Sequence, residues 1–194
     1  AKDLQIPFTH LDMSKPQNEI LKLFLSNMTE ETSTQPYIRP TWDEYFMEVC
    51  RAVAKRATCD RGRVGSVIAR DKHILVTGYA GAPKGMPHCD EIGHQMKTVT
   101  HEDGHQSQHC MRTAHAEQNA IVQAANLGIS IEGATCYCRM TPCAACAKML
   151  INAGIKKVVC EKRYHTGSET EEMFRKVGME LDYFENEVQA YANQ

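Results

Sequence analysis

The chain has 194 residues, of which 42% are hydrophobic and 24% are charged, and its formal net charge is −2. These values are ordinary for one globular domain. The chain has no excess of basic residues of the kind that nucleic-acid-binding proteins often show, so we expect no nucleic-acid partner. No apolar run reaches the roughly 18 residues of a membrane span, and the beginning, AKDLQIPFTH, lacks the basic-then-apolar form of a secretion signal.

Residues 1–40 are interpreted as an N-terminal extension and linker, followed by one domain over 41–194. Within the extension, NEILKLFLSN (18–27) could form a short amphipathic helix, and a polar stretch with two prolines follows over 28–40. A loosely packed arm and an oligomer contact are the two interpretations of this segment.

The domain begins with a helix, for which Thr41 and Glu44 form a capping box. VGSVIA (64–69) and HILVTGY (73–79) are typical of two strands joined by a tight turn. Residues 80–114 show no clear periodicity. A loop of that length in a compact domain is usually functional or held in place by another feature.

The second half of the domain alternates helices with strands. The predicted elements are a helix over 115–128, a strand over 134–140, a helix over 142–153, a strand over 156–160, a helix over 168–177 with SETE as its capping box, and a strand over 179–184. Gly128, Gly154 and Gly178 end the three helices. Because strands joined through a helix run parallel, this order predicts a three-layer α/β/α sandwich with a mixed five-stranded sheet.

The chain carries nine cysteines and nine histidines. An odd number of cysteines without a secretion signal favours metal ligation over a disulfide framework, and we expect a reducing, cytoplasmic setting. Four of the cysteines are interpreted as small core residues: Cys50, Cys136, Cys138 and Cys160.

Two short motifs carry chemistry, HAEQNA (115–120) and TPCAAC (141–146). They supply His115, Cys143 and Cys146 as zinc ligands, which is the number that a catalytic zinc site takes while water holds the fourth position. All three lie at predicted helix starts, where partial positive charge favours the thiolate. The metal lowers the pKa of its water toward neutrality.

Glu117 distinguishes a catalytic site from a structural one. A structural zinc site fills all four positions with ligands, whereas a carboxylate beside the metal can move protons. Because residues two apart do not share a face of a regular helix, this role requires that HAE lies at the helix start. H-x-E with P-C-x-x-C is the signature of zinc nucleobase deaminases. A structural zinc and reduced core cysteines are the alternatives.

Longer stretches extend this pattern: RPTWDEYFMEV, TCDRGRVGSVI, GYAGAPKGMPHC, HCMRTAHAEQNAI and IEGATCYCRMTPCAACAKMLINAGIKKVV. From about Arg39 to about Gly178, the chain resembles the deoxycytidylate (dCMP) deaminases of the zinc-dependent cytidine and deoxycytidylate deaminase family. The resemblance implies a cytidine deaminase-like fold and the conversion of dCMP to dUMP with release of ammonia, in pyrimidine deoxynucleotide metabolism.

The resemblance also implies roles for single residues. Glu117 would protonate N3 of the base and then the leaving amine. Tyr164 corresponds to the tyrosine that stacks on the base, with a core aromatic as its alternative, and Ala116 belongs to the substrate site. Arg63 and Ser66, near the VG pair, are candidate donors to the 5′-phosphate.

A second, structural zinc is implied as well, and it would hold the long segment over 80–114. The candidate ligands are Cys59, Cys89 and His94, with His109 or Cys110, and with His101 and His105 as competitors.

One departure concerns regulation. The family sequence GYNG stands here as GYAG, over Gly78, Tyr79, Ala80 and Gly81. In the family, the asparagine belongs to an allosteric site where dCTP activates and dTTP inhibits, and Ala80 has no side-chain donor or acceptor. We hypothesise that regulation is lost or that the site reads a different ligand. The family's common assembly, a hexamer, implies a homo-oligomer.

Three other functions are compatible with the motifs. A deaminase acting on dCTP or another nucleotide differs only in its phosphate contacts. A deaminase acting on adenosine in RNA shares HAE and PCxxC, but the net charge of −2 speaks against it. A catalytically silent nucleotide-sensing module is the third, and the intact Glu117 speaks against it.

Overall fold

The computed structural model describes residues 37–100, 104, 106–165, 167–185 and 187–189. The chain divides into two compact units, residues 1–39 and 40–194, and the second unit holds the elements described below. The predicted helix over 18–27 and most of the linker after it lie outside the described residues.

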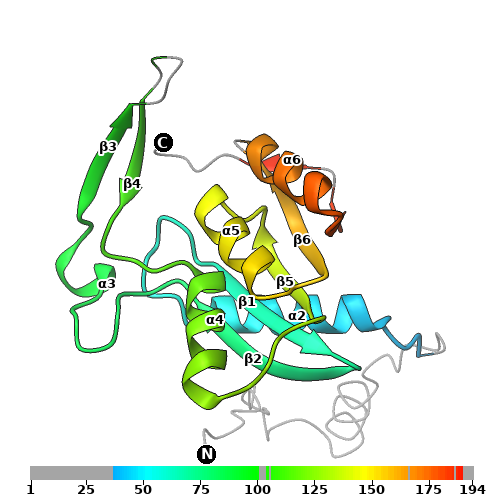
Figure 1. Ribbon diagram of the computed structural model, residues 1–194. Helices are drawn as coiled ribbons and strands as arrows, with labels where there is room; N and C mark the ends of the chain where they lie inside the picture. The colour runs from blue at the N-terminus through cyan, green and yellow to red at the C-terminus, as the bar shows by residue number, and fades with distance from the viewer. Residues whose placement is uncertain (1–36, 101–103, 105, 166, 186, 190–194) are drawn as a thin grey trace, which may run out of the picture. The chain divides into compact units, whose positions relative to one another are not determined.

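The described part of this unit contains both helices and strands (Figure 1). The helices are α2 (Trp42–Ala54), α3 (Cys89–Ile92), α4 (Ala116–Leu127), α5 (Ala144–Asn152) and α6 (Ser168–Val177). The strands are β1 (Gly65–Arg70), β2 (His73–Tyr79), β3 (Met96–Thr100), β4 (Gln106–Cys110), β5 (Thr135–Met140), β6 (Lys157–Tyr164), β7 (Glu180–Tyr183) and β8 (Val188–Gln189). Among the described helices, none combines the length and the apolar character needed to cross a membrane.

The main sheet has the strand order β2-β1-β5-β6-β7, and the two-residue β8 pairs with β6. Strand β1 runs antiparallel to β2 and β5, whereas β5, β6 and β7 run parallel to one another. Helix α2 covers one face, and α4, α5 and α6 lie on the other (Figure 1). The predicted three-layer sandwich with a mixed sheet is confirmed.

The core has two halves because neighbouring residues of a strand point to opposite faces of the sheet. On one face, Val67 of β1 belongs to a cluster with Phe46 of α2. On the other face, Ile68 belongs to a cluster with Leu150 of α5 and Phe174 of α6. The cysteines interpreted as core residues are all buried: Cys50, Cys136, Cys138 and Cys160.

The helix ends agree with the sequence at several points. Thr41 caps α2 through its side chain, and the Glu44 carboxylate accepts the Thr41 N–H at 2.6 Å, so the capping box is confirmed. Gly128 and Gly178 follow α4 and α6 in the left-handed conformation that glycine adopts without a steric cost.

The capping box predicted at Ser168 is wrong. The N-cap of α6 is Gly167, which has helical dihedral angles (φ −76°, ψ −8°) and makes no side-chain cap hydrogen bond. Glu171, which would close the box, instead accepts a hydrogen bond from Tyr183 Oη at 2.8 Å. A carboxylate engaged by a tyrosine of β7 is not available to the first turn of its own helix.

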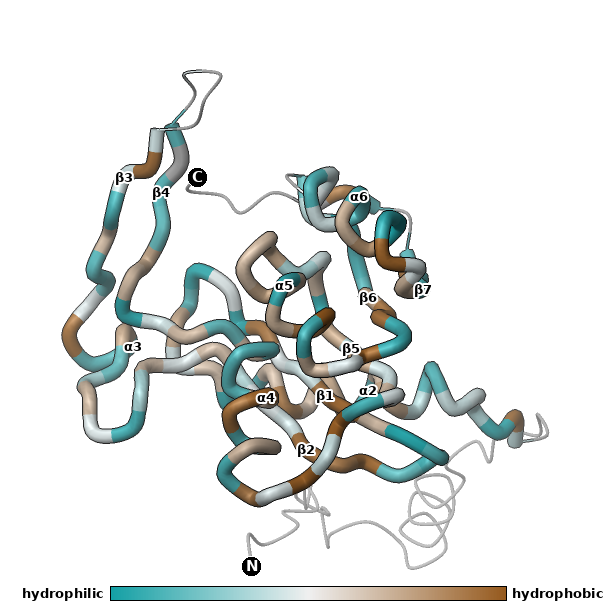
Figure 2. Tube along the Cα trace, in the orientation of Figure 1, coloured by the Kyte–Doolittle hydropathy of each residue, from teal (hydrophilic) through white to brown (hydrophobic). Residues whose placement is uncertain are grey.

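The segment over 80–114 contains strands that the sequence did not predict. Strands β3 and β4 form a separate antiparallel ribbon, in which Met96 pairs with Cys110 and Thr100 with Gln106. The ribbon extends away from the main sheet (Figure 1), and much of it is hydrophilic (Figure 2). It therefore lacks the apolar alternation that marks a half-buried strand.

Candidate metal centre and active site

Two helix starts bring the three predicted zinc ligands together. His115 is the N-cap of α4, Cys143 is the N-cap of α5, and Cys146 lies in the first turn of α5. His115 Nδ1 lies 3.5 Å from Cys143 Sγ and 3.4 Å from Cys146 Sγ, and the three atoms lie within 4.8 Å of one another. One nitrogen and two sulfur ligands at this spacing fit a zinc ion with one open position.

Helix α4 can approach strand β2 closely because Gly78 has no side chain. A Cβ at Gly78 would lie 2.2 Å from the carbonyl oxygen of Ala116 and 2.4 Å from the amide nitrogen of Ala120. Asn119 Nδ2 also donates to the Tyr79 carbonyl at 2.7 Å. Residues of the GYAG motif thus set the position of the first turn of α4.

Hydrogen bonds among the three ligand side chains shift their pKa values. The hydrogen bond with Cys143 raises the pKa of His115 to about 9, and the hydrogen bond from Cys146 lowers the pKa of Cys143 to about 3. Its bond with Cys143 raises the pKa of Cys146 above the ordinary thiol value. Zinc takes a neutral imidazole and thiolates as ligands, so metal binding here releases protons.

Glu117 lies in the first turn of α4 and is only 5% exposed. Because HAE lies at the helix start, His115 and Glu117 both line one cavity although they are two residues apart. Burial raises the pKa of Glu117. A buried carboxyl group with a raised pKa is typical of general acids and bases.

The cavity has a volume of about 620 Å³, which lies within the range of roughly 300–1,000 Å³ that is usual for ligand sites. The predicted site residues in its wall are Cys59, Ala80, His109, Cys110, His115, Ala116, Glu117, Cys143 and Tyr164. Arg61 and His165 also line it and were not predicted to do so. Arg61 stands two residues before Arg63 in the sequence RGR, a signal that could have marked it.

A family model, the cytidine and deoxycytidylate deaminase zinc-binding region, matches residues 40–162. The chain belongs to this deaminase family. ComE operon protein 2 of Bacillus subtilis is 37% identical over 147 residues, which are 76% of this chain and 73% of that protein. The deoxycytidylate deaminase of Schizosaccharomyces pombe is 35% identical over 143 residues, which are 74% of this chain but 44% of that enzyme.

A solved structure supports the same assignment. The crystal structure of dCMP deaminase from the cyanophage S-TIM5, in complex with dCMP and dUMP, is 29% identical to this chain with a TM-score of 0.62. The match covers 76% of this chain and 100% of the phage chain. The resemblance seen in the five sequence stretches is therefore confirmed.

The two predicted phosphate contacts of this deaminase are engaged by other groups. Ser66 is fully buried in β1, where its Oγ lies 3.4 Å from Cys136 Sγ. Arg63 forms an ion pair with Asp90, whose Oδ1 lies 3.2 Å from Nη2. The register of β1 turns Ser66 into the core, and Asp90 engages Arg63, so neither residue is among those that line the cavity.

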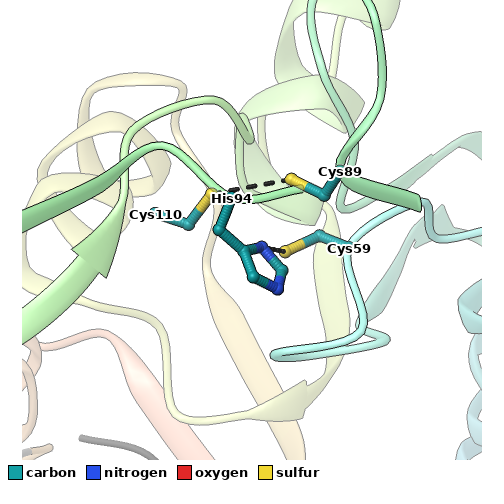
Figure 3. A group of neighbouring side chains, drawn as sticks. All are labelled: Cys59, Cys89, His94 and Cys110. Carbon is teal, nitrogen blue, oxygen red and sulfur yellow. Dashed lines mark hydrogen bonds between the residues drawn. The ribbon is translucent and has the colours of Figure 1, made fainter. Parts of the chain in front are cut away.

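The deaminase holds a second cluster of ligand groups, formed by Cys59, Cys89, His94 and Cys110 (Figure 3). Cys89 Sγ lies 3.6 Å from Cys110 Sγ, and Cys59 Sγ lies 3.7 Å from His94 Nδ1. On the other side of the imidazole, Nε2 lies 3.0 Å from Asp60 Oδ1. A carboxylate on the far nitrogen is the usual partner of a metal-binding histidine.

This second cluster fits a structural zinc, because its four ligands fill a tetrahedral site. Cys110 belongs to it, whereas the alternative His109 lines the cavity instead. The competitors His101 and His105 lie outside the described residues. Cys59 and Cys110 also line the cavity, so both clusters contribute to the same wall.

Proposed function

We propose that this protein is a zinc-dependent hydrolytic deaminase that converts dCMP to dUMP and ammonia. The observation that carries the proposal is the meeting of His115, Cys143 and Cys146 with the buried Glu117 in one cavity. Support also comes from the relatives, several of which are named deoxycytidylate deaminases, and from the phage enzyme that binds dCMP and dUMP.

His115, Cys143 and Cys146 would hold the metal. When bound, zinc supplies a Lewis acid that lowers the pKa of water. Glu117 would carry two protons in turn, one to N3 of cytosine and one to the departing amine, and both would come from the water that supplies the new oxygen atom. The net change replaces the amino group at C4 with an oxygen atom from water. Tyr164, in the cavity wall, would stack on the base.

The proposal assigns the 5′-phosphate to Arg61 in place of Arg63 and Ser66. Arg61 lines the cavity, and its Nη2 donates to the Gln108 carbonyl at 2.9 Å, which fixes the guanidinium against the middle of strand β4. A guanidinium recognises phosphate through its planar fork of donors. His165 is a second basic residue in the same wall.

Deamination of dCTP is the second candidate function. Three side chains of the cavity wall, Arg61, His109 and His165, can donate hydrogen bonds to phosphate oxygens. A triphosphate would engage more of them than a monophosphate. The two functions share the metal site and Glu117, and they differ in the number of phosphates that the wall holds.

A second, structural zinc at Cys59, Cys89, His94 and Cys110 is part of the proposal, supported by the ligand geometry and by Asp60. So are a deaminase domain over 41–194 and a homo-oligomer, in the family form a hexamer. None of the nine cysteines, all of which the structure describes, is paired in a disulfide, and we propose a reducing, cytoplasmic setting.

A substrate panel tests the proposal. The purified protein is incubated with dC, dCMP, dCTP, CMP and dAMP, and the deaminated product is followed by chromatography. We expect turnover of dCMP alone. Preference for dCTP would keep the metal chemistry and select the second function, and activity only on dAMP would overturn the assignment of the base. Zinc analysis of the same sample is expected to give two ions per chain.

A further inference from the structure

Thr141, which directly precedes the PCxxC motif, lies within a chain of hydrogen bonds. It is 3% exposed and lines the cavity. Its Oγ1 accepts the backbone N–H of Tyr164 at 3.0 Å and lies 3.2 Å from Tyr183 Oη. Tyr183 in turn donates to Glu171 Oε1 at 2.8 Å. The chain of bonds joins the aromatic wall of the cavity to β7 and α6.

The number of protons fixes the direction of these bonds. A tyrosine hydroxyl has one hydrogen and an ionised carboxylate has none, so Tyr183 donates to Glu171. The bond between Thr141 and Tyr183 must then run from the Thr141 hydroxyl to Tyr183 Oη. Thr141 Oγ1 keeps its lone pair for the N–H of Tyr164. Each hydroxyl in this chain thus accepts one hydrogen bond and donates the next, and hydrogen bonds in such a chain polarise and strengthen one another.

Two further contacts hold the same segment from the same side. Thr170 Oγ1, in the first turn of α6, donates to the Pro142 carbonyl at 2.8 Å. Gly167 packs against Thr141, since a Cβ at Gly167 would lie 3.0 Å from Thr141 Cγ2. The α6–β7 segment therefore restrains both residues that precede the ligand Cys143.

We propose that Tyr183 is a positioning residue for the deaminase reaction. It is not among the residues that line the cavity, and it lies beyond residues 40–162, the region matched by the family model. Through Thr141, Tyr183 fixes the backbone of Tyr164 and hence the wall against which the base stacks. The inference rests on the proposed function. Under this proposal, a residue of strand β7 influences nucleotide binding without lining the cavity.

The test compares Tyr183→Phe with Tyr137→Phe. Tyr137 Oη also donates to a carboxylate, Asp43 at 2.6 Å, but on the opposite, α2 face of the sheet. In Tyr183→Phe we expect the KM for dCMP to rise about threefold to tenfold, the net effect of one hydrogen bond, with kcat and zinc content unchanged. Tyr137→Phe is expected to keep the wild-type KM. The same KM in both variants would overturn the proposal.

A second measurement does not depend on turnover. The hydrogen exchange rate of the Tyr164 amide, followed by NMR, is expected to rise in Tyr183→Phe and to stay at the wild-type rate in Tyr137→Phe. Glu171→Gln keeps both the Tyr183 hydroxyl and an acceptor oxygen for it, and is expected to keep the slow exchange of the wild type. Unchanged exchange in Tyr183→Phe would refute the positioning role. If the wild type fails to deaminate dCMP, the proposed function fails and this measurement still decides the role of Tyr183.

Discussion

Gly78 and Ala116 approach so closely that no side chain fits between them, because a Cβ at Gly78 would lie 2.2 Å from the Ala116 carbonyl oxygen. Ala116 stands between the ligand His115 and the carboxylate Glu117. We expect Gly78→Ala to lower the free energy of unfolding by about 1–3 kcal/mol, the usual effect of overpacking, and to weaken zinc binding. Urea unfolding and metal titration measure the two effects.

Gly81→Ala is the matched control for that experiment. A Cβ at Gly81 would meet Thr58 Oγ1 at 3.1 Å and the Tyr79 ring at 3.4 Å. Both are side-chain atoms, which can shift more readily than the backbone of α4. We expect Gly81→Ala to retain zinc affinity, and equal losses in the two variants would contradict the special role of Gly78.

Glu117→Gln is expected to lower the rate of deamination by about 10²–10⁴-fold, the usual contribution of a positioned acid or base. The amide keeps the size of the side chain but cannot exchange the proton. Because Glu117 is not one of the three metal ligands, the zinc content of the variant should equal that of the wild type. A rate close to that of the wild type would contradict the proton-transfer role.

Cys89→Ser is expected to lower the bound zinc from two ions per chain to one, as measured by atomic absorption. It removes one of the four ligands of the second cluster and leaves the catalytic ligands in place. Cys160→Ala, which removes a buried thiol outside both clusters, is the control and should retain both ions. Two ions in Cys89→Ser would contradict the role of Cys89 as a required ligand of this site.

Glu161 predicts a pH dependence of stability. It is 5% exposed and accepts hydrogen bonds from Arg51 Nε and Arg139 Nε, each at 2.6 Å. Burial raises the pKa of Glu161, but the bonds from the two arginines outweigh burial and bring it below the ordinary value of 4.5. Stabilisation from a lowered pKa is present above the unfolded-state value and is lost as the pH falls through the folded-state pKa.

We therefore expect the free energy of unfolding to fall as the pH is lowered from about 5 toward about 3, and Glu161→Gln to reduce that slope. At pH 7, the same substitution should cost about 1.5–3 kcal/mol, as for hydrogen bonds to a charged group. Glu172→Gln is the control, since Glu172 forms a surface pair with Lys176. A slope that Glu161→Gln leaves unchanged would contradict the assignment.

Ala80 lines the cavity itself, and it offers an effector no side-chain donor or acceptor. We expect the rate of deamination at saturating dCMP to be the same with and without dCTP or dTTP. A clear change caused by either nucleotide would mean that regulation persists without a polar side chain at this position.

The parts of the site that local motifs encode could be predicted from the sequence. His115 and Glu117 share one helix start, and Cys143 and Cys146 share another, so their spacing is fixed within a few residues of chain. The alternation of strands and helices after Gly128 likewise predicted the parallel strands β5, β6 and β7, because each element carries its own hydrophobic period.

Contacts between distant segments could not be predicted in this way. Ser66 was proposed as a phosphate contact because of its neighbours in sequence, but the pairing of β1 with β5 buries it against Cys136. The capping box at Ser168 has the right residues, yet Tyr183 engages Glu171 from another strand. In both cases a tertiary contact outweighs the local pattern.

His115 and Cys143 begin two different helices and stand 28 residues apart in the chain. A metal ion bound between them acts as a reversible crosslink that the unfolded polypeptide does not form as tightly. Because zinc binds the folded state more tightly, each tenfold rise in the free zinc concentration above the dissociation constant adds about 1.4 kcal/mol to the free energy of unfolding. Two preparations with identical sequences, one from zinc-starved and one from zinc-replete cells, would therefore differ in melting temperature and in survival against proteases.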